Sequence, residues 1–147
     1  MTLTEAKARE TEWITLGNQA AGEFLWLWDA YVHAIDDLVD GDRTGSEALL
    51  DTFAQAISIY THPFFMEHMV ALRQIAVNCT NAYADAAAWE KEKGWKLEFS
   101  DHYRHFAVEM VIAIAAICGG YAHARRVSPA LRELCWKQHH NEKGEIV

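Results

Sequence analysis

Proline is nearly absent from this sequence, and glycine is infrequent. The 147 residues include two prolines and eight glycines, whereas hydrophobic residues make up 51% of the chain and include six tryptophans. Proline breaks helix interiors and glycine weakens them, so their scarcity leaves long stretches free to form helices. The apolar content is enough for a substantial core and excludes a disordered chain. The composition therefore favours an all-helical fold.

Cysteine and basic residues are also few. The three cysteines, Cys79, Cys118 and Cys135, lie far apart and form no CxxC pair, so neither a disulfide framework nor a zinc knuckle is indicated. Free thiols suit a reducing cytoplasm, where we expect the protein to be. Thirteen Lys and Arg stand against 21 Asp and Glu, which gives a net charge of −8. Because nucleic acids are bound by clustered basic residues, they are not expected partners.

Long apolar runs and the common nucleotide-binding motifs are missing as well. The longest apolar run, about 106–118, is interrupted by Glu109 and is shorter than the ~20 residues that a membrane span needs. The polar start of the chain, MTLTEAKARETEW, does not have the pattern of a signal peptide. No GxGxxG, P-loop or GxSxG pattern occurs. We therefore expect no membrane span and no phosphate-binding loop of the usual kinds.

Apolar residues recur at steps of three and four, which is the spacing of a helix face. Helices are predicted at about 4–15, 19–40, 46–60, 63–92, 101–124 and 129–140. Ser46 is the expected N-cap of the third helix, and five of its residues are expected to face inward: Leu49, Leu50, Phe53, Ile57 and Tyr60. Short connections between long helices imply antiparallel neighbours. The sequence therefore predicts one all-α domain over residues 1–147, an antiparallel bundle of four main helices with an N-terminal lead-in and a short C-terminal helix.

The stretch HAIDDLVDGD, residues 33–42, crowds carboxylates into the end of the second predicted helix. Asp36 and Asp40 continue a stripe that begins with Asp29 and His33, and Asp37 lies beside them. Carboxylates one turn apart repel each other, and the C-terminal end of a helix is already negative. A bound cation would remove both penalties. The alternative is a solvated outer face, which is what charged stripes usually form.

Two further polar stripes could belong to the same site. Asn81 and Asp85 lie one turn apart on the predicted helix over 63–92, and His102, His105 and Glu109 lie on the next one. His and carboxylate side chains are metal ligands. Glu109 is the single charge in a long apolar stretch, and its alternative role is a structural pair with a Lys, Arg or Tyr.

Basic residues near the same predicted end of the bundle could hold a phosphate beside a metal ion, Arg43 among them. They could equally be loop charges that keep the protein soluble.

The stretch YVHAIDDLVDGD (31–42) resembles the first aspartate-rich motif, DDxxD, of class I isoprenoid synthases, and is closest to the squalene and phytoene synthase branch. The stretch TNAYADAAAWE (80–90) is similar to the second motif of that branch, in which an Asn precedes an Asp by four residues. In that family the two motifs bind magnesium, which holds the diphosphate of the substrate. The resemblance implies metal-binding roles for Asp36, Asp37 and Asp40, and a place in the same site for Asn81 and Asp85.

A second resemblance is to the all-α nucleotide pyrophosphatases, small helical bundles with the pattern ExxE followed by ExxD. Asp37 and Asp40 have the three-residue spacing of that pattern, while Glu47 and Asp51 are four apart. These enzymes also bind magnesium and a diphosphate. In both families carboxylates converge on a divalent metal, which neutralises phosphate charge.

These observations lead to two hypotheses of different classes. The first is Mg²⁺-dependent binding or turnover of a diphosphate-containing small molecule, without an assigned catalytic residue. The expected metal ligands are Asp36, Asp37, Asp40, Asp85 and Glu109, and the expected substrate-binding residues are Asn81, Arg43, His102 and His105. The second is a non-catalytic association domain, in which an exposed aromatic face near Trp13, Trp26 or Trp136 binds a partner protein or a second copy in a homodimer.

Overall fold

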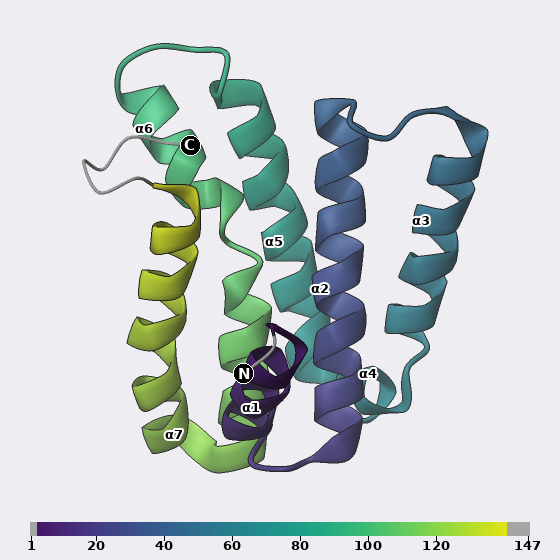
Figure 1. Ribbon diagram of the computed structural model, residues 1–147, viewed down its shortest axis with the longest axis vertical. Coiled ribbons are helices and arrows are strands. Elements are labelled where there is room, and N and C mark those ends of the chain that lie inside the picture. Colours follow the sequence, from purple (N-terminus) through teal and green to yellow (C-terminus); the bar gives the residue numbers. More distant parts are fainter. Residues whose placement is uncertain (1–2, 141–147) are drawn as a thin grey trace. The chain divides into compact units, whose positions relative to one another are not determined.

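The computed structural model describes residues 3–140, and every element in that range is an α-helix (Figure 1). The prediction of an all-helical protein is therefore confirmed. The chain divides into two compact units, Met1–Asn78 and Cys79–Val147, and the boundary between them falls inside one helix. Each unit has its own set of helix contacts and is described by itself.

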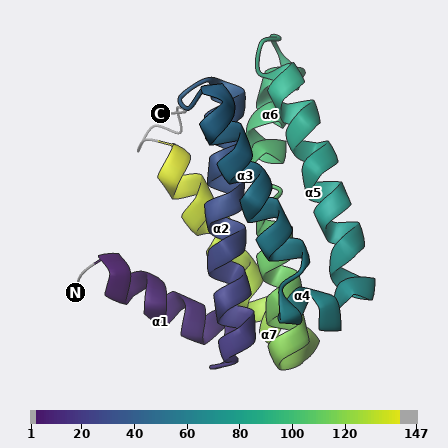
Figure 2. The same cartoon turned by 90° about the vertical axis from the view of Figure 1, so that its right-hand side faces the viewer.

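The first unit contains α1 (Leu3–Thr15), α2 (Gln19–Asp40), α3 (Gly45–Tyr60), α4 (Pro63–Glu67) and the first half of α5 (Met69–Trp89). The observed bounds of α2 match the predicted range of 19–40. α3 begins one residue earlier than expected, and its N-cap is Thr44 instead of Ser46. A short loop joins α2 to α3, and the two helices lie antiparallel and side by side (Figures 1 and 2).

Aromatic rings from α2 and α4 form the centre of the first unit. Phe24 is fully buried, and its ring centroid lies 5.7 Å from that of Phe64 and 5.9 Å from that of Phe65. Tyr60, at the end of α3, meets Phe65 edge-on at 5.3 Å. Asn18 caps α2 by accepting a hydrogen bond from the backbone N–H of Ala21 at 3.0 Å. These contacts fix where α2 begins and which face it buries.

α3 packs with the opposite face from the one that its sequence predicts. Its buried residues are Ala48, Thr52 and Ile59. Four of the five residues expected to face inward are exposed instead: Leu49, Leu50, Phe53 and Ile57. Ala48 and Thr52 on the buried face are small and allow a close approach to the neighbouring helix, which larger side chains there would prevent. The prediction failed because it gave the core to the face with the largest apolar residues.

The second unit contains the rest of α5, then α6 (Trp95–Arg104) and α7 (Val108–His139). Three predicted boundaries are wrong. The helix over 63–92 is interrupted at His68, which ends α4. The helix over 101–124 is divided between α6 and α7 by a short break after Arg104. The predicted break at residues 125–129 is absent, since the chain stays helical through Pro129.

The main interruption in α7 is at Gly120, whose φ of 77° and ψ of −179° lie outside the helical region. This backbone conformation is essentially limited to glycine. The preceding Gly119 is required for a second reason, because a Cβ there would lie 2.6 Å from the ring of the buried His123. The pair of glycines therefore sets the position of the bend.

By length and composition, α7 is also apolar enough over Val108–Gln138 to cross a membrane. The bend at Gly120, however, divides it into two segments that turn back on each other (Figure 1). Arg132 Nη2 in the second segment lies 2.5 Å from Glu109 Oε1 in the first. α7 is thus a helical hairpin within its unit, and neither segment is a continuous apolar stretch of the ~20 residues that a span requires.

Candidate functional site

The last two turns of α2 carry three carboxylates. Asp36 and Asp37 are half-buried, and Asp40 is exposed. The last turn of α2 contains no basic residue, and the helix ends at Gly41 in the left-handed conformation (φ 80°). Carboxylates one turn apart repel each other, and the helix dipole is negative at this end. A positive ligand would lessen both effects.

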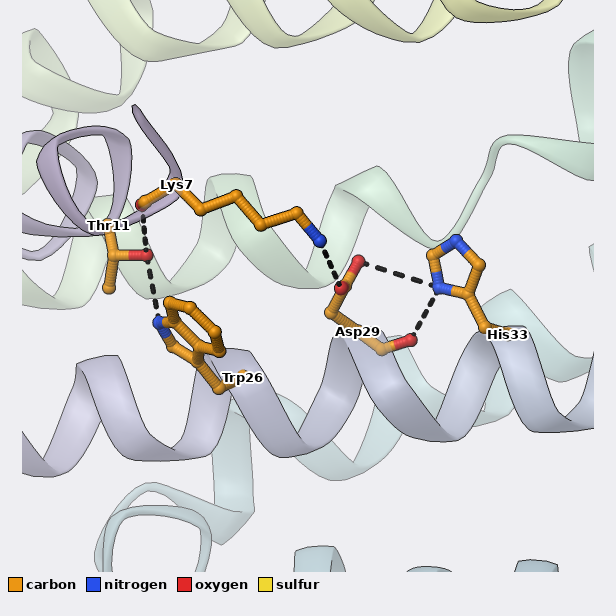
Figure 3. A network of polar contacts seen from close by, with 5 residues as sticks. All are labelled: Lys7, Thr11, Trp26, Asp29 and His33. Atoms are coloured by element: carbon orange, nitrogen blue, oxygen red, sulfur yellow. Dashed lines mark hydrogen bonds and ion pairs between the residues drawn. The ribbon is translucent and has the colours of Figure 1, made fainter. Parts of the chain in front are cut away.

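The beginning of the same acidic stripe has a structural explanation. Asp29 Oδ2 lies 3.6 Å from Lys7 Nζ of α1, and the Nδ1 of His33 donates to the backbone carbonyl of Asp29 at 2.7 Å (Figure 3). Beside them, the indole N–H of Trp26 donates to the hydroxyl of Thr11 at 3.1 Å. These contacts dock α1 on α2. The candidate site is therefore limited to the carboxylates after His33.

Arg43 lies in the loop that follows the carboxylates and connects the ends of α2 and α3. Its backbone N–H donates to the carbonyl of Asp37 at 3.0 Å. Its guanidinium Nη2 is 3.3 Å from Asp51 Oδ2 on α3. Both side chains of this ion pair are about half exposed, so the pair is weak. Arg43 is thus held next to the candidate site by its backbone, while its side chain is able to exchange Asp51 for another anion.

Within the described part of the chain, no three His, Cys, Asp or Glu side chains gather as ligands for a metal ion. A structural zinc or calcium site would need such a group. Magnesium differs, because it keeps several of its waters and usually takes only one or two carboxylates together with substrate phosphates. In the described residues, Asp36, Asp37 and Asp40 therefore do not form a three-ligand group, and their expected role in binding magnesium stays a prediction.

The remaining predicted site residues belong to the second unit. Asn81 and Asp85 are exposed on α5, and His102 is exposed on α6. His105 directly follows α6, and its Nε2 lies 3.7 Å from Asp101 Oδ1. Glu109 is paired with Arg132, which is the structural alternative that the sequence left open for it. Their expected roles in metal or substrate binding stay predictions.

Asp101 was not among the predicted site residues, yet its carboxylate makes two contacts with histidines. Its carboxylate lies between two imidazoles, His105 at 3.7 Å and His140 at 2.9 Å. Nδ1 of His140 lies 2.9 Å from the carbonyl of Trp136, which can only accept, so this nitrogen carries a proton. The four-residue spacing of Asp101 and His105 was visible in the sequence, whereas the contact with His140 depends on the fold. These contacts attach the end of α7 to α6.

Cys79 is buried next to Glu109, and its thiol donates to the carbonyl of Phe106 at 3.4 Å. Burial, and then the negative charge of Glu109, raise the pKa of Cys79 to about 11. Because the thiolate is the reactive form, this cysteine is a poor nucleophile at neutral pH.

No family model, no curated protein and no solved structure matches this chain. Function is therefore inferred from its own residues.

Proposed function

We propose that the protein binds Mg²⁺ together with a diphosphate-containing small molecule at the C-terminal end of α2. The observation that carries this proposal is the placement of Asp36, Asp37 and Asp40 in the last two turns of a helix whose last turn has no basic residue. A divalent cation would turn the repulsion at this helix end into attraction. Asp36 and Asp40 are separated by one turn, which suits two carboxylates that share a cation.

The diphosphate would complete the coordination of the metal. Magnesium bound by one or two carboxylates retains open positions for waters and for phosphate oxygens. Arg43 supplies a planar cation that pairs with phosphate as readily as with the carboxylate of Asp51. If turnover occurs, the metal and Arg43 would stabilise the charge on a departing pyrophosphate.

The two family resemblances imply different organic groups on the diphosphate. In the isoprenoid synthase-like version, the helices form an antiparallel bundle of four main helices, and the diphosphate carries a prenyl chain. In the version that is similar to the all-α nucleotide pyrophosphatases, Glu47 and Asp51 of α3 take part and the ligand is a nucleotide. Both versions use the same metal–diphosphate chemistry, so inorganic pyrophosphate is the appropriate first probe.

Thermal melts of the whole chain test this proposal under four conditions: buffer alone, Mg²⁺, pyrophosphate, and both together. A ligand at about 100 times its Kd adds about 2.7 kcal/mol to the free energy of unfolding. For a chain of this size, that corresponds to a rise in Tm of roughly 5–10 °C. We expect a small rise with Mg²⁺ and a larger one with both ligands. An unchanged Tm under all four conditions would mean that the three aspartates are ordinary surface charges that bind neither Mg²⁺ nor pyrophosphate.

Amide substitutions locate the effect at the end of α2. Asp36→Asn and Asp40→Asn keep the shape of the side chain and remove its charge, so each should abolish most of the Mg²⁺-dependent rise in Tm. Arg43→Gln should leave the response to Mg²⁺ alone intact and reduce the additional rise with pyrophosphate. Glu67→Gln is the matched control, because Glu67 is an exposed carboxylate in α4 of the same unit. It should respond like the wild-type chain.

A further inference from the structure

His140, the C-cap residue of α7, has both nitrogens of its ring placed against hydrogen-bond acceptors. Its Nδ1 lies 2.9 Å from the backbone carbonyl of Trp136, and its Nε2 lies 2.9 Å from Asp101 Oδ2 on α6. A carbonyl and an ionised carboxylate only accept, so both ring nitrogens have to donate. A neutral imidazole has one N–H donor, whereas the imidazolium has two. This geometry therefore belongs to the protonated, cationic form of His140.

The shared proton lies on His140 and not on Asp101. Carboxyl groups of aspartate ordinarily ionise at about pH 4, whereas histidine ordinarily loses its proton at about pH 6.5. His105 Nε2 lies 3.7 Å from the other oxygen of Asp101, Oδ1, so the carboxylate has an imidazole on each side. Two donor groups beside one carboxylate favour its ionised form.

Three further features of the position favour a cation. The ring of His140 stacks on the indole of Trp136, with centroids 4.4 Å apart and planes at 6° to each other, and the face of an indole attracts a cation. His140 also lies at the C-terminal end of α7, where the helix dipole is negative. Its side chain is only 5% exposed, so solvent ions screen the pair with Asp101 little.

We propose that His140 and Asp101 form a pH-sensitive latch, which holds the end of α7 against α6 while His140 is protonated and releases it as the pH rises. Loss of one proton leaves a lone pair on one ring nitrogen, which then faces an acceptor with no hydrogen atom between them. Because the ring is buried, the lost hydrogen bond is costly in the closed position. Release of His140 uncovers the carboxylate of Asp101 and the indole face of Trp136.

The other charged groups at the latch are His105 and Lys137. His105 competes with His140 for Asp101 when it is itself protonated. Lys137 lies one turn before His140 on α7 and is exposed, so solvent weakens its repulsion of the imidazolium. The hydrogen bonds fix the sign of the pH dependence. The latch stabilises the fold below about pH 6.5, loses this effect at alkaline pH, and loses it again below about pH 4, where carboxylates are protonated.

Thermal melts of whole chains at pH 5.5 and pH 8.5 provide the first test. His140→Phe keeps a ring that stacks on Trp136 and removes both hydrogen bonds. We expect its Tm to fall below that of the wild type by roughly 5 °C more at pH 5.5 than at pH 8.5. Asp101→Asn should behave in the same way. The double variant should lose little more than either single variant, because all three break the same contact.

His102→Phe is the matched control, because His102 is an exposed histidine on the same helix as Asp101. Its effect on Tm should be equal at the two pH values. An effect of His140→Phe that is equal at both pH values or larger at pH 8.5, or additive losses in the double variant, would overturn the proposal.

The indole N–H signal of Trp136 in NMR spectra gives a local readout that does not depend on global stability, and Trp136→Phe assigns it. In the wild type this signal should move between pH 5.5 and pH 8.5. In His140→Arg it should stay in place, because the arginine is charged at both pH values. A wild-type signal that does not move, or one that moves equally in His140→Arg, would contradict the latch.

The latch goes beyond the proposed diphosphate site and does not rest on it, because Asp101 and His140 belong to the second unit. Asp40→Asn should keep the pH-dependent signal of Trp136, whereas His140→Phe should keep the rise in Tm with Mg²⁺ and pyrophosphate. The failure of one proposal therefore leaves the other in place.

Discussion

At the scale of single residues, the pKa of Cys79 reflects the buried position of its thiol in the second unit. Its pKa is raised from 9.0 to about 11, mainly by burial and then by Glu109. The folded chain therefore holds the thiol proton more tightly than the unfolded chain does. The resulting contribution to stability is fully present below about pH 9 and is lost as the pH rises towards 11.

Alkylation of the folded chain by iodoacetamide should follow this pKa. At pH 8 ionisation alone makes Cys79 roughly a hundredfold less reactive than an ordinary thiol. Glu109→Gln removes the nearby negative charge, so the midpoint of the rate against pH should fall. The fall should be only partial, because burial is the larger cause. Mass spectrometry of the labelled peptides gives the three cysteine rates separately.

Glu133→Gln is the control for this experiment, because Glu133 is an exposed acid on the same helix. It should leave the midpoint for Cys79 unchanged. Rapid labelling of Cys79 in the wild-type chain at pH 8 would contradict its buried environment.

Glu109 also shows what a sequence predicts about one residue and what it does not. A lone carboxylate in an apolar stretch needs a partner, and the sequence left two open, a metal ion and a Lys, Arg or Tyr side chain. The partner in the structure is Arg132, which lies 23 positions further along the chain. The two side chains meet because α7 bends. Likewise, the spacing of Asp29 and His33 placed them on one stripe, but the pairing of Asp29 with Lys7 required the docking of α1.

At the scale of elements, the bend of α7 depends on Gly120. Gly→Ala in an ordinary helix stabilises by up to about 1 kcal/mol. At Gly120 the sign should reverse, because φ is 77° and an L side chain is strained there. We expect Gly120→Ala to destabilise the chain by about 1–3 kcal/mol, a fall in Tm of roughly 3–10 °C.

The control substitution is Ala122→Gly, at an exposed position two residues later. It should cost no more than about 1 kcal/mol by helix propensity alone. Thermal melts compare the Tm of Gly120→Ala and of Ala122→Gly with that of the wild-type chain. A neutral or raised Tm for Gly120→Ala would mean that α7 is a straight helix.

Helix periodicity predicted where most elements lie, and the errors have physical causes. α1, α2 and α3 were located within about two residues, because their apolar patterns are flanked by glycine and capping residues. The break was predicted at RRVSP (125–129), which contains a helix-breaking proline, whereas the bend in α7 lies at Gly120. For α3 both faces are apolar, and periodicity alone does not say which of them the core takes.

At the scale of the whole molecule, negative charge and exposed apolar side chains lie on different parts of the first unit. Carboxylates gather at the end of α2, and α3 exposes Leu49, Leu50, Phe53 and Ile57. The all-helical class was predictable from composition and periodicity. The division into two units was not, because the boundary falls inside α5, where no loop or change of composition marks it.

The central claim is that a cation and a diphosphate bind at the C-terminal end of α2, where one or two of Asp36, Asp37 and Asp40 hold the cation. Calorimetric titration of pyrophosphate into the chain in the presence of Mg²⁺ tests it most directly, with the wild type compared with the Asp36→Asn/Asp40→Asn double variant. We predict saturable binding in the wild type and a Kd at least roughly tenfold weaker in the double variant, which corresponds to about 1.4 kcal/mol. Equal binding by both chains, or no binding by either, would contradict the claim.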